Sequence, residues 1–151
     1  MADHSKMLAY VAGCTDPAKL EQLIDNARNQ DADDVAEAAF RRLISLVPHA
    51  APGTVEHDFW STVHAFEHVL KQERGKTVRL SRTRQKVARD GVVATLASWA
   101  AGKPTDGFEM LRERGMLDLA GEAIILRHPT HFDPAVLAAA RDRLSEAGYL
   151  A

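Results

Sequence analysis

Eight lysine and arginine side chains lie between residues 71 and 90, together with only two acidic ones. The flanking regions have the opposite character: residues 1–70 carry a formal charge of about −6 and residues 91–151 one of about −2, so the chain totals −2 at pH 7. We call residues 71–90 the basic segment. Such charge asymmetry indicates a partner rather than a fold. It predicts an anionic partner, nucleic acid first.

The composition of the basic segment suits phosphate recognition. Five of its eight cations are arginines, whose planar guanidinium can bind a phosphate through two parallel hydrogen bonds. Gln85 adds a neutral group that can bond to phosphates or base edges. The predicted nucleic-acid-binding residues are Lys71, Arg74, Lys76, Arg79, Arg82, Arg84, Gln85, Lys86 and Arg89.

The basic segment contains no aromatic residue. Proteins that bind single strands typically stack bases on aromatic rings, so this composition favours double-stranded DNA, contacted through its phosphate backbone. We therefore predict a small regulatory or accessory protein that binds nucleic acid through a basic loop and helix.

The position of the cations within the segment also indicates an anion. Ser81 is expected to cap a helix, which places Arg82, Arg84 and Lys86 in its first turns. Cations at a helix N-terminus oppose the helix dipole. An anion bound at that end would remove the conflict, because free N–H groups and arginine side chains converge on it.

Two other uses of the basic segment stay open. Its cations can pair with the acidic N-terminal half, or they can bind an acidic protein partner. The alternative function is therefore a helical protein-interaction or adaptor module without nucleic-acid binding. Such a module would use an apolar groove between helices or the acidic N-terminal surface.

Histidines form two groups that are candidates for metal binding. His57, His64 and His68 lie within about 40° of one another on a helical wheel, and His64 and His68 have the spacing of a zinc-binding helix. His128 and His131 form the second group. The first group lies opposite the apolar face of its own helix, so we interpret it as a solvent-facing stripe. We assign no metal site and leave the metal question open.

Catalytic motifs are not evident. The triplet at residues 75–77, Gly-Lys-Thr, matches the end of a phosphate-binding loop, but Leu70 stands where that motif needs glycine and no strand precedes it. No Gly-x-Ser-x-Gly, Cys-x-x-Cys or paired-carboxylate pattern occurs. We lean against an enzyme and expect no cofactor.

The periodicity of apolar residues predicts an all-α protein. The chain is expected to fold as one domain, residues 1–151, in a compact bundle of seven to eight helices. Its possible halves are an acidic helical hairpin, residues 1–50, packed on a basic-edged helical half, residues 54–151. We expect one helix that begins at Pro17 and a second that starts at residues 31–34 and stops before Pro48. Further helices are predicted at about 54–74, from the Ser81 cap to about 101 with a break favoured at Gly91, at 107–114, at 117–127 and from Pro134 to the residue before Gly148.

The first hairpin resembles a tetratricopeptide repeat over about 30 residues. The matching packing positions are Leu23, Ala27, Ala36, Phe40, Leu43 and Pro48. An array of such repeats needs about three copies, and no second copy is evident in the sequence. We interpret the hairpin as a generic antiparallel helix pair.

Composition indicates the expected compartment. The one cysteine, Cys14, excludes an intrachain disulfide and is expected to be a small buried side chain. The N-terminus lacks the pattern of a signal peptide, and no apolar stretch approaches the ~20 residues that span a bilayer. We expect a cytoplasmic protein without membrane association.

Overall fold

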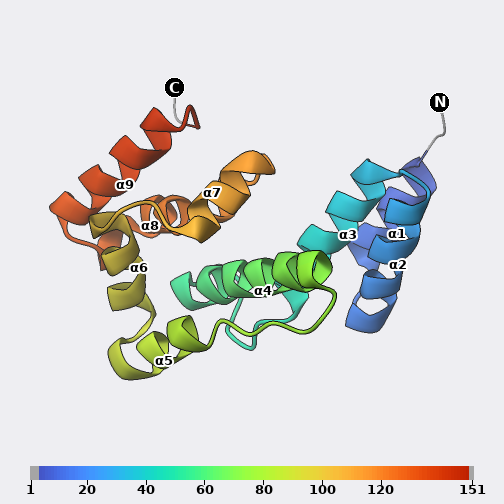
Figure 1. The fold of residues 1–151 in the computed structure, drawn as a ribbon, viewed down its shortest axis with the longest axis horizontal. Coiled ribbons are helices and arrows are strands. Elements are labelled where there is room, and N and C mark those ends of the chain that lie inside the picture. The colour runs from blue at the N-terminus through green and yellow to red at the C-terminus, as the bar shows by residue number, and fades with distance from the viewer. Residues whose placement is uncertain (1–3, 150–151) are drawn as a thin grey trace. The chain divides into compact units, whose positions relative to one another are not determined.

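The computed structural model describes residues 4–149 and is helical throughout, as predicted (Figure 1). Within that range it contains nine α-helices, two short 3₁₀ turns and no strand. The chain divides into two compact units, Met1–His49 and Ala50–Ala151. The elements are α1 (Ser5–Gly13), α2 (Pro17–Asn29), α3 (Asp33–Leu46), α4 (Val55–Arg74), α5 (Ser81–Asp90), α6 (Val92–Ala101), α7 (Asp106–Glu113), η1 (Leu117–Leu119), α8 (Gly121–Arg127), η2 (Pro129–His131) and α9 (Pro134–Glu146).

The number of helices differs slightly from the predicted seven to eight. Helix α1 was not predicted, because it is only nine residues long, lacks a side-chain cap and has one buried residue, Val11.

The predicted break within residues 81–101 is confirmed. Gly91 separates α5 from α6 with a backbone φ of 91°, a conformation that strongly favours glycine.

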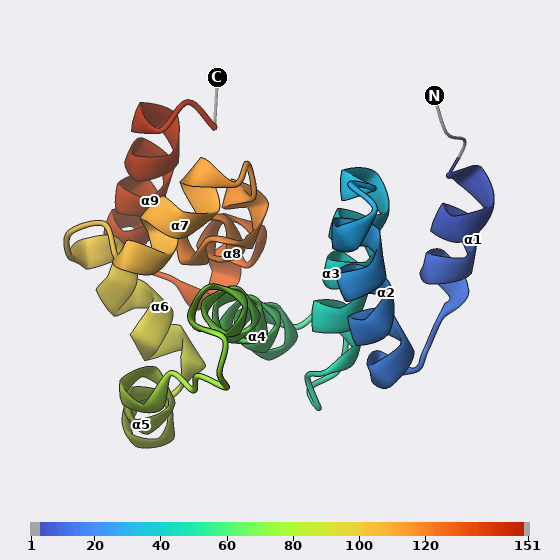
Figure 2. The ribbon, with the colours of Figure 1, turned by 45° about the vertical axis from the view of Figure 1, so that its right-hand side comes forward.

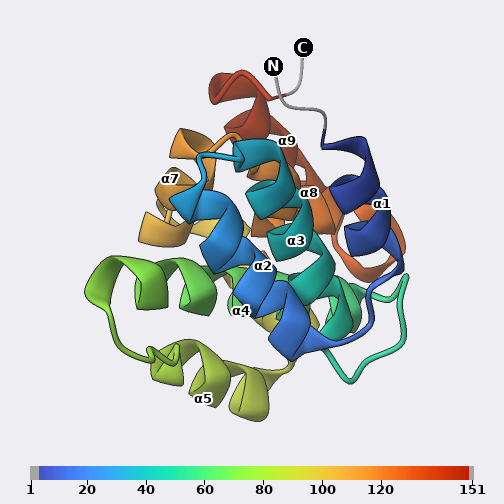
Figure 3. The ribbon, with the colours of Figure 1, turned by 90° about the vertical axis from the view of Figure 1, so that its right-hand side faces the viewer.

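The first unit is a helical hairpin with a third helix against it. Helices α2 and α3 lie side by side (Figure 3), and α1 packs on α3. Asp16 caps α2 by accepting a hydrogen bond from the Ala18 amide at 3.0 Å, and Pro17 occupies the first helical position. Cys14 is buried, as predicted, and its carbonyl accepts a 2.9 Å hydrogen bond from Arg42.

The second unit is built around α4. Figure 2 looks along this helix, which contacts both α6 and α8. The Phe59 ring stacks on Trp99 at a centroid distance of 5.4 Å and meets Trp60 edge-on at 5.3 Å. Burying such large apolar surfaces is the main stabilising contribution to the unit. The core cluster comprises Val55, Phe59, Val63, Leu96, Ala100, Ile124, Ile125 and Ala140.

The single helix predicted for residues 117–127 is wrong. The structure has the 3₁₀ turn η1, then extended backbone at Ala120, then α8. The Thr62 hydroxyl donates a 2.5 Å hydrogen bond to the Leu119 carbonyl. A Cβ on Gly121 would lie 2.7 Å from the Trp99 ring, so α8 approaches α6 closely only because residue 121 has no side chain. These contacts come from distant parts of the chain and override the local helical pattern.

A buried ion pair joins α8, α9 and the end of α6. Arg143 donates a 2.7 Å hydrogen bond to Glu122, whose side chain is only 4% exposed. The same guanidinium donates to the carbonyls of Trp99 and Gly102. Each buried charge therefore has polar partners, which is the condition under which burial of an ion pair is tolerated.

We found no helix in residues 4–149 with the length and apolar character needed to cross a membrane.

Removing one partner of the buried pair should strongly destabilise the second unit. We expect Arg143→Met to lower the free energy of unfolding by about 3–5 kcal/mol, because Glu122 would be left buried without a counter-charge. Urea unfolding followed by tryptophan fluorescence measures this, since both tryptophans lie in this unit. Arg141→Met, at an exposed position of the same helix, should change the free energy little. Equal losses of stability in the two variants would contradict the assignment of Arg143 as the counter-charge of buried Glu122.

Candidate nucleic-acid interface

The basic segment runs from the last turn of α4, through the loop of residues 75–80, into α5 (Figure 1). The predicted end of α4 is confirmed: Gly75 has a left-handed backbone with φ of 71° and its amide donates to the Lys71 carbonyl. Arg84 and Lys86 are half-buried. The remaining predicted binding residues are exposed, namely Lys71, Arg74, Lys76, Arg79, Arg82, Gln85 and Arg89.

Arg84 is bound to a carboxylate of the chain itself. Its Nη2 and Nε atoms lie 2.7 and 3.0 Å from the two oxygens of Glu67, in a bidentate contact. Its guanidinium also lies over the Trp60 ring, 5.3 Å from the ring centroid. Glu67 belongs to α4, so this contact fixes α5 to the central helix.

The predicted cap at Ser81 is wrong. Ser81 is the first helical residue, Leu80 precedes it, and no side-chain hydrogen bond caps the helix. The Leu80 amide instead donates to Glu67 at 2.7 Å. An anion does lie at the start of α5, as the charge pattern indicated, but it is the carboxylate of Glu67.

The environment of Glu67 favours its ionised form. Burial, the largest single influence, raises the pKa of the Glu67 carboxyl. The hydrogen bonds from Arg84 and from the Leu80 amide together outweigh it, so the pKa lies below its ordinary value. The same contact raises the pKa of Arg84. Both groups are therefore charged at neutral pH.

Asp90 holds two further cations of the segment. It accepts hydrogen bonds from Arg89 at 3.2 and 3.3 Å and from Lys86 at 3.2 Å. These bonds, the one from Arg89 first, lower the pKa of the Asp90 carboxyl. Arg89 lies in the last turn of α5, where a cation interacts favourably with the helix dipole.

Within the second unit, over residues 50–149, five cations of the segment have no carboxylate partner: Lys71, Arg74, Lys76, Arg79 and Arg82. We call these five the open cations. They fall within twelve consecutive residues, from the last turn of α4 to the first turn of α5. Glu73, the acid among them, forms an ion pair with Arg114 at 2.5 Å. Its charge is therefore offset by a cation from outside the segment.

The histidines do not form the predicted solvent-facing stripe. His57 is only 8% exposed, and His64 and His68 are half-buried. The prediction was wrong because burial extends around most of the circumference of α4 rather than along one apolar face.

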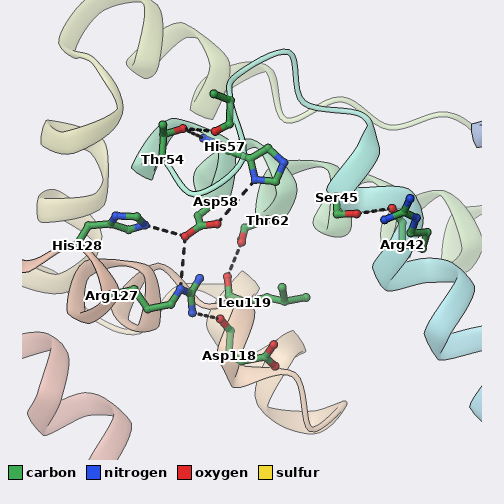
Figure 4. Close-up of polar contacts among 11 residues, drawn as sticks. Arg42, Ser45, Thr54, His57, Asp58, Thr62, Asp118, Leu119, Arg127 and His128 are labelled. Carbon is green, nitrogen blue, oxygen red and sulfur yellow. Dashed lines mark hydrogen bonds and ion pairs between the residues drawn. The ribbon is translucent and has the colours of Figure 1, made fainter. Parts of the chain in front are cut away.

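A polar cluster that the sequence did not indicate surrounds Asp58 (Figure 4). His128 Nε2 lies 2.7 Å from Asp58 Oδ2, Arg127 Nε lies 3.4 Å from it, and His57 Nδ1 lies 3.8 Å from Oδ1. These contacts join the first turn of α4 to the end of α8.

His131 is exposed, with its ring centroid 6.4 Å from that of His128. Over residues 4–149, no group of three or more His, Cys, Asp or Glu side chains is arranged to hold a metal ion.

Comparison with protein-family models, with curated proteins and with solved structures found no match to this chain.

The contact between Glu67 and Arg84 should make stability depend on pH in a defined direction. Because the folded-state pKa of Glu67 lies below its ordinary value of 4.5, its ionised form stabilises the fold fully above that pH, and this contribution is lost as the pH falls through the lowered pKa. We expect Glu67→Gln to destabilise the protein at pH 7, with the difference from wild type shrinking below pH 4.5, as measured by urea unfolding.

The matched control is Glu109→Gln. It removes an exposed ion pair between Glu109 and Arg112, which lie one turn apart on the same helix. Exposed pairs contribute about 0–1 kcal/mol, so this change should have a small effect. A difference between wild type and Glu67→Gln that stays constant from pH 7 to pH 3 would refute the role given to Glu67.

Proposed function

We propose that this protein binds nucleic acid, with duplex DNA favoured, through the open cations. The observation that supports the proposal most directly is that these five exposed side chains lack carboxylate partners within their own unit, over residues 50–149, although the chain as a whole is acidic. A protein under selection for stability alone has many acids available to neutralise such a stretch. Arg84, Lys86 and Arg89 are left out of the proposed contact set because Glu67 and Asp90 already hold them.

The contact is proposed to be made mainly with phosphates. Exposed lysine and arginine side chains neutralise backbone charge and release condensed counterions, which supplies most non-specific affinity. With five open cations, log K should fall against log salt with a slope of roughly −4 to −5. The segment offers no aromatic side chain for stacking, which is the reason for favouring a duplex over a single strand. Gln85 is exposed on α5 and can add a neutral hydrogen bond.

Removing two open cations should weaken binding and reduce its salt dependence. We expect the double change Arg79→Ala, Arg82→Ala to lower affinity for duplex DNA about tenfold and to make the salt slope shallower by about 2, since each phosphate contact contributes about 0.9. Gel shifts with duplex DNA, single-stranded DNA and RNA over a range of salt concentrations measure both quantities.

The matched control is the double change Lys103→Ala, Arg141→Ala. It removes the same charge from two exposed positions of the same unit that lie outside the basic segment. It should leave the salt slope unchanged. The absence of binding to any duplex at low salt, or equal losses in both variants, would refute the proposal.

A second candidate function, protein interaction, is favoured by a groove in the first unit. The groove has a volume of about 470 Å³ and is lined by Met7, Tyr10 and Leu23. Met7 and Tyr10 are 42% and 48% exposed, and side chains of these two types are enriched at protein interfaces. Lys6 and Lys19, the only lysines of the first unit, also line it. A lining that combines apolar side chains with two lysines suits an acidic amphipathic helix.

This second candidate has its own test. A labelled synthetic peptide with leucines on one helical face and glutamates on the other should bind the full chain in a fluorescence anisotropy titration. We expect Tyr10→Ser to weaken that binding. Tyr149→Ser, at the other exposed tyrosine, which is 44% exposed, should not change it. Failure of the peptide to bind, or equal loss in both variants, would reject the groove as a docking site.

A further inference from the structure

A cleft of about 330 Å³ opens in the second unit between the ends of α4 and α6 and the beginnings of α5 and α7. Its volume lies at the lower end of the ~300–1,000 Å³ typical of small-ligand sites. It is lined mainly by apolar side chains: Phe66, Leu70, Leu80, Trp99 and Met110. A cleft of this size and lining accommodates a flat apolar body of one or two rings.

The aromatic side of the cleft is rigidly built. Phe66 is 8% exposed, and Trp99 is stacked against Phe59 of the core. A Cβ on Gly107 would lie 2.7 Å from the Phe66 ring, so the start of α7 contacts that ring directly with its backbone. These contacts fix the two rings, and the parts of the rings that line the cleft are therefore preformed for contact with an aromatic ligand.

The charged groups that line the cleft are Arg74 and Asp106. Both are exposed, and neither has an ion-pair partner within the second unit, over residues 50–149. Arg74 can hold a carboxylate through two parallel hydrogen bonds, whereas Asp106 disfavours an anion. Thr83 and Thr105 add hydroxyl groups, and that of Thr105 already accepts a hydrogen bond from the Phe108 amide at 3.1 Å.

We propose that this cleft binds a small aromatic carboxylate, with its ring against Phe66 and Trp99 and its carboxylate on Arg74. The site does not depend on nucleic-acid binding. It does share Arg74 with the open cations, and Leu80 and Thr83 belong to the basic segment. A ligand in the cleft would therefore remove one cation from the surface proposed to contact phosphates, and by linkage each ligand would weaken the binding of the other.

The test is a calorimetric titration of the full chain with 2-naphthoate at low salt, without nucleic acid. We expect saturable binding of one molecule per chain. The neutral analogue 2-naphthamide should bind about tenfold more weakly, because it lacks the charge that Arg74 recognises. Failure of 2-naphthoate to bind, or equal binding of the amide, would overturn the proposal.

Three variants locate the site. Arg74→Gln should weaken 2-naphthoate about tenfold, whereas Lys71→Gln, an equivalent loss of charge one turn earlier on α4 and outside the cleft, should not. Asp106→Asn should tighten binding, because it removes the negative charge at the cleft. Equal losses in Arg74→Gln and Lys71→Gln, or weaker binding in Asp106→Asn, would refute the assignment. Arg79 and Arg82 do not line the cleft, so the gel-shift test can fail while this one succeeds.

Discussion

The bidentate contact between Glu67 and Arg84 determines what the basic segment can present to a partner. Helix α5 has no fully buried residue, so packing alone holds it weakly. Its apolar anchors, Leu80 before the helix and Val87 within it, are only half-buried against the core. Glu67 adds directional bonds to both the Leu80 amide and the Arg84 guanidinium, and Trp60 lies under that guanidinium. One carboxylate of the central helix therefore fixes where α5 begins and how it faces.

This contact also divides the cations by role. Glu67 or Asp90 binds the cations that lie on α5 after its first turn. The cations from the end of α4 to the first turn of α5 have no carboxylate partner within the second unit, over residues 50–149. A formal charge of about +6 for the segment therefore overstates the charge offered to a ligand. The open cations are the part of that charge which remains for phosphates, and Arg74 is the member that also lines the apolar cleft.

Features set by local sequence were predictable, and features set by distant residues were not. The end of α4 at Gly75 and the break at Gly91 depend on residues close in sequence, and both were predicted. The burial of His57, the division of residues 117–127 and the contact of Asp58 with His128 depend on residues up to 70 positions apart. The short helix α1 escaped prediction because nine residues with one buried side chain carry too little periodic signal.

The start of α5 shows how a correct physical inference can name the wrong chemical group. Cations in the first turns of a helix oppose its dipole, so their presence does indicate an anion. That reasoning cannot distinguish an external phosphate from a carboxylate of the same chain, because both are anions that accept hydrogen bonds from backbone N–H groups and from a guanidinium. Glu67 lies 13 residues before Leu80, beyond the range of any helical or turn pattern, and only the fold brings it there. Cations next to a helix N-terminus therefore point to a ligand only where no carboxylate of the chain reaches them. Within the second unit, over residues 50–149, Arg79 and Arg82 meet this condition and Arg84 does not.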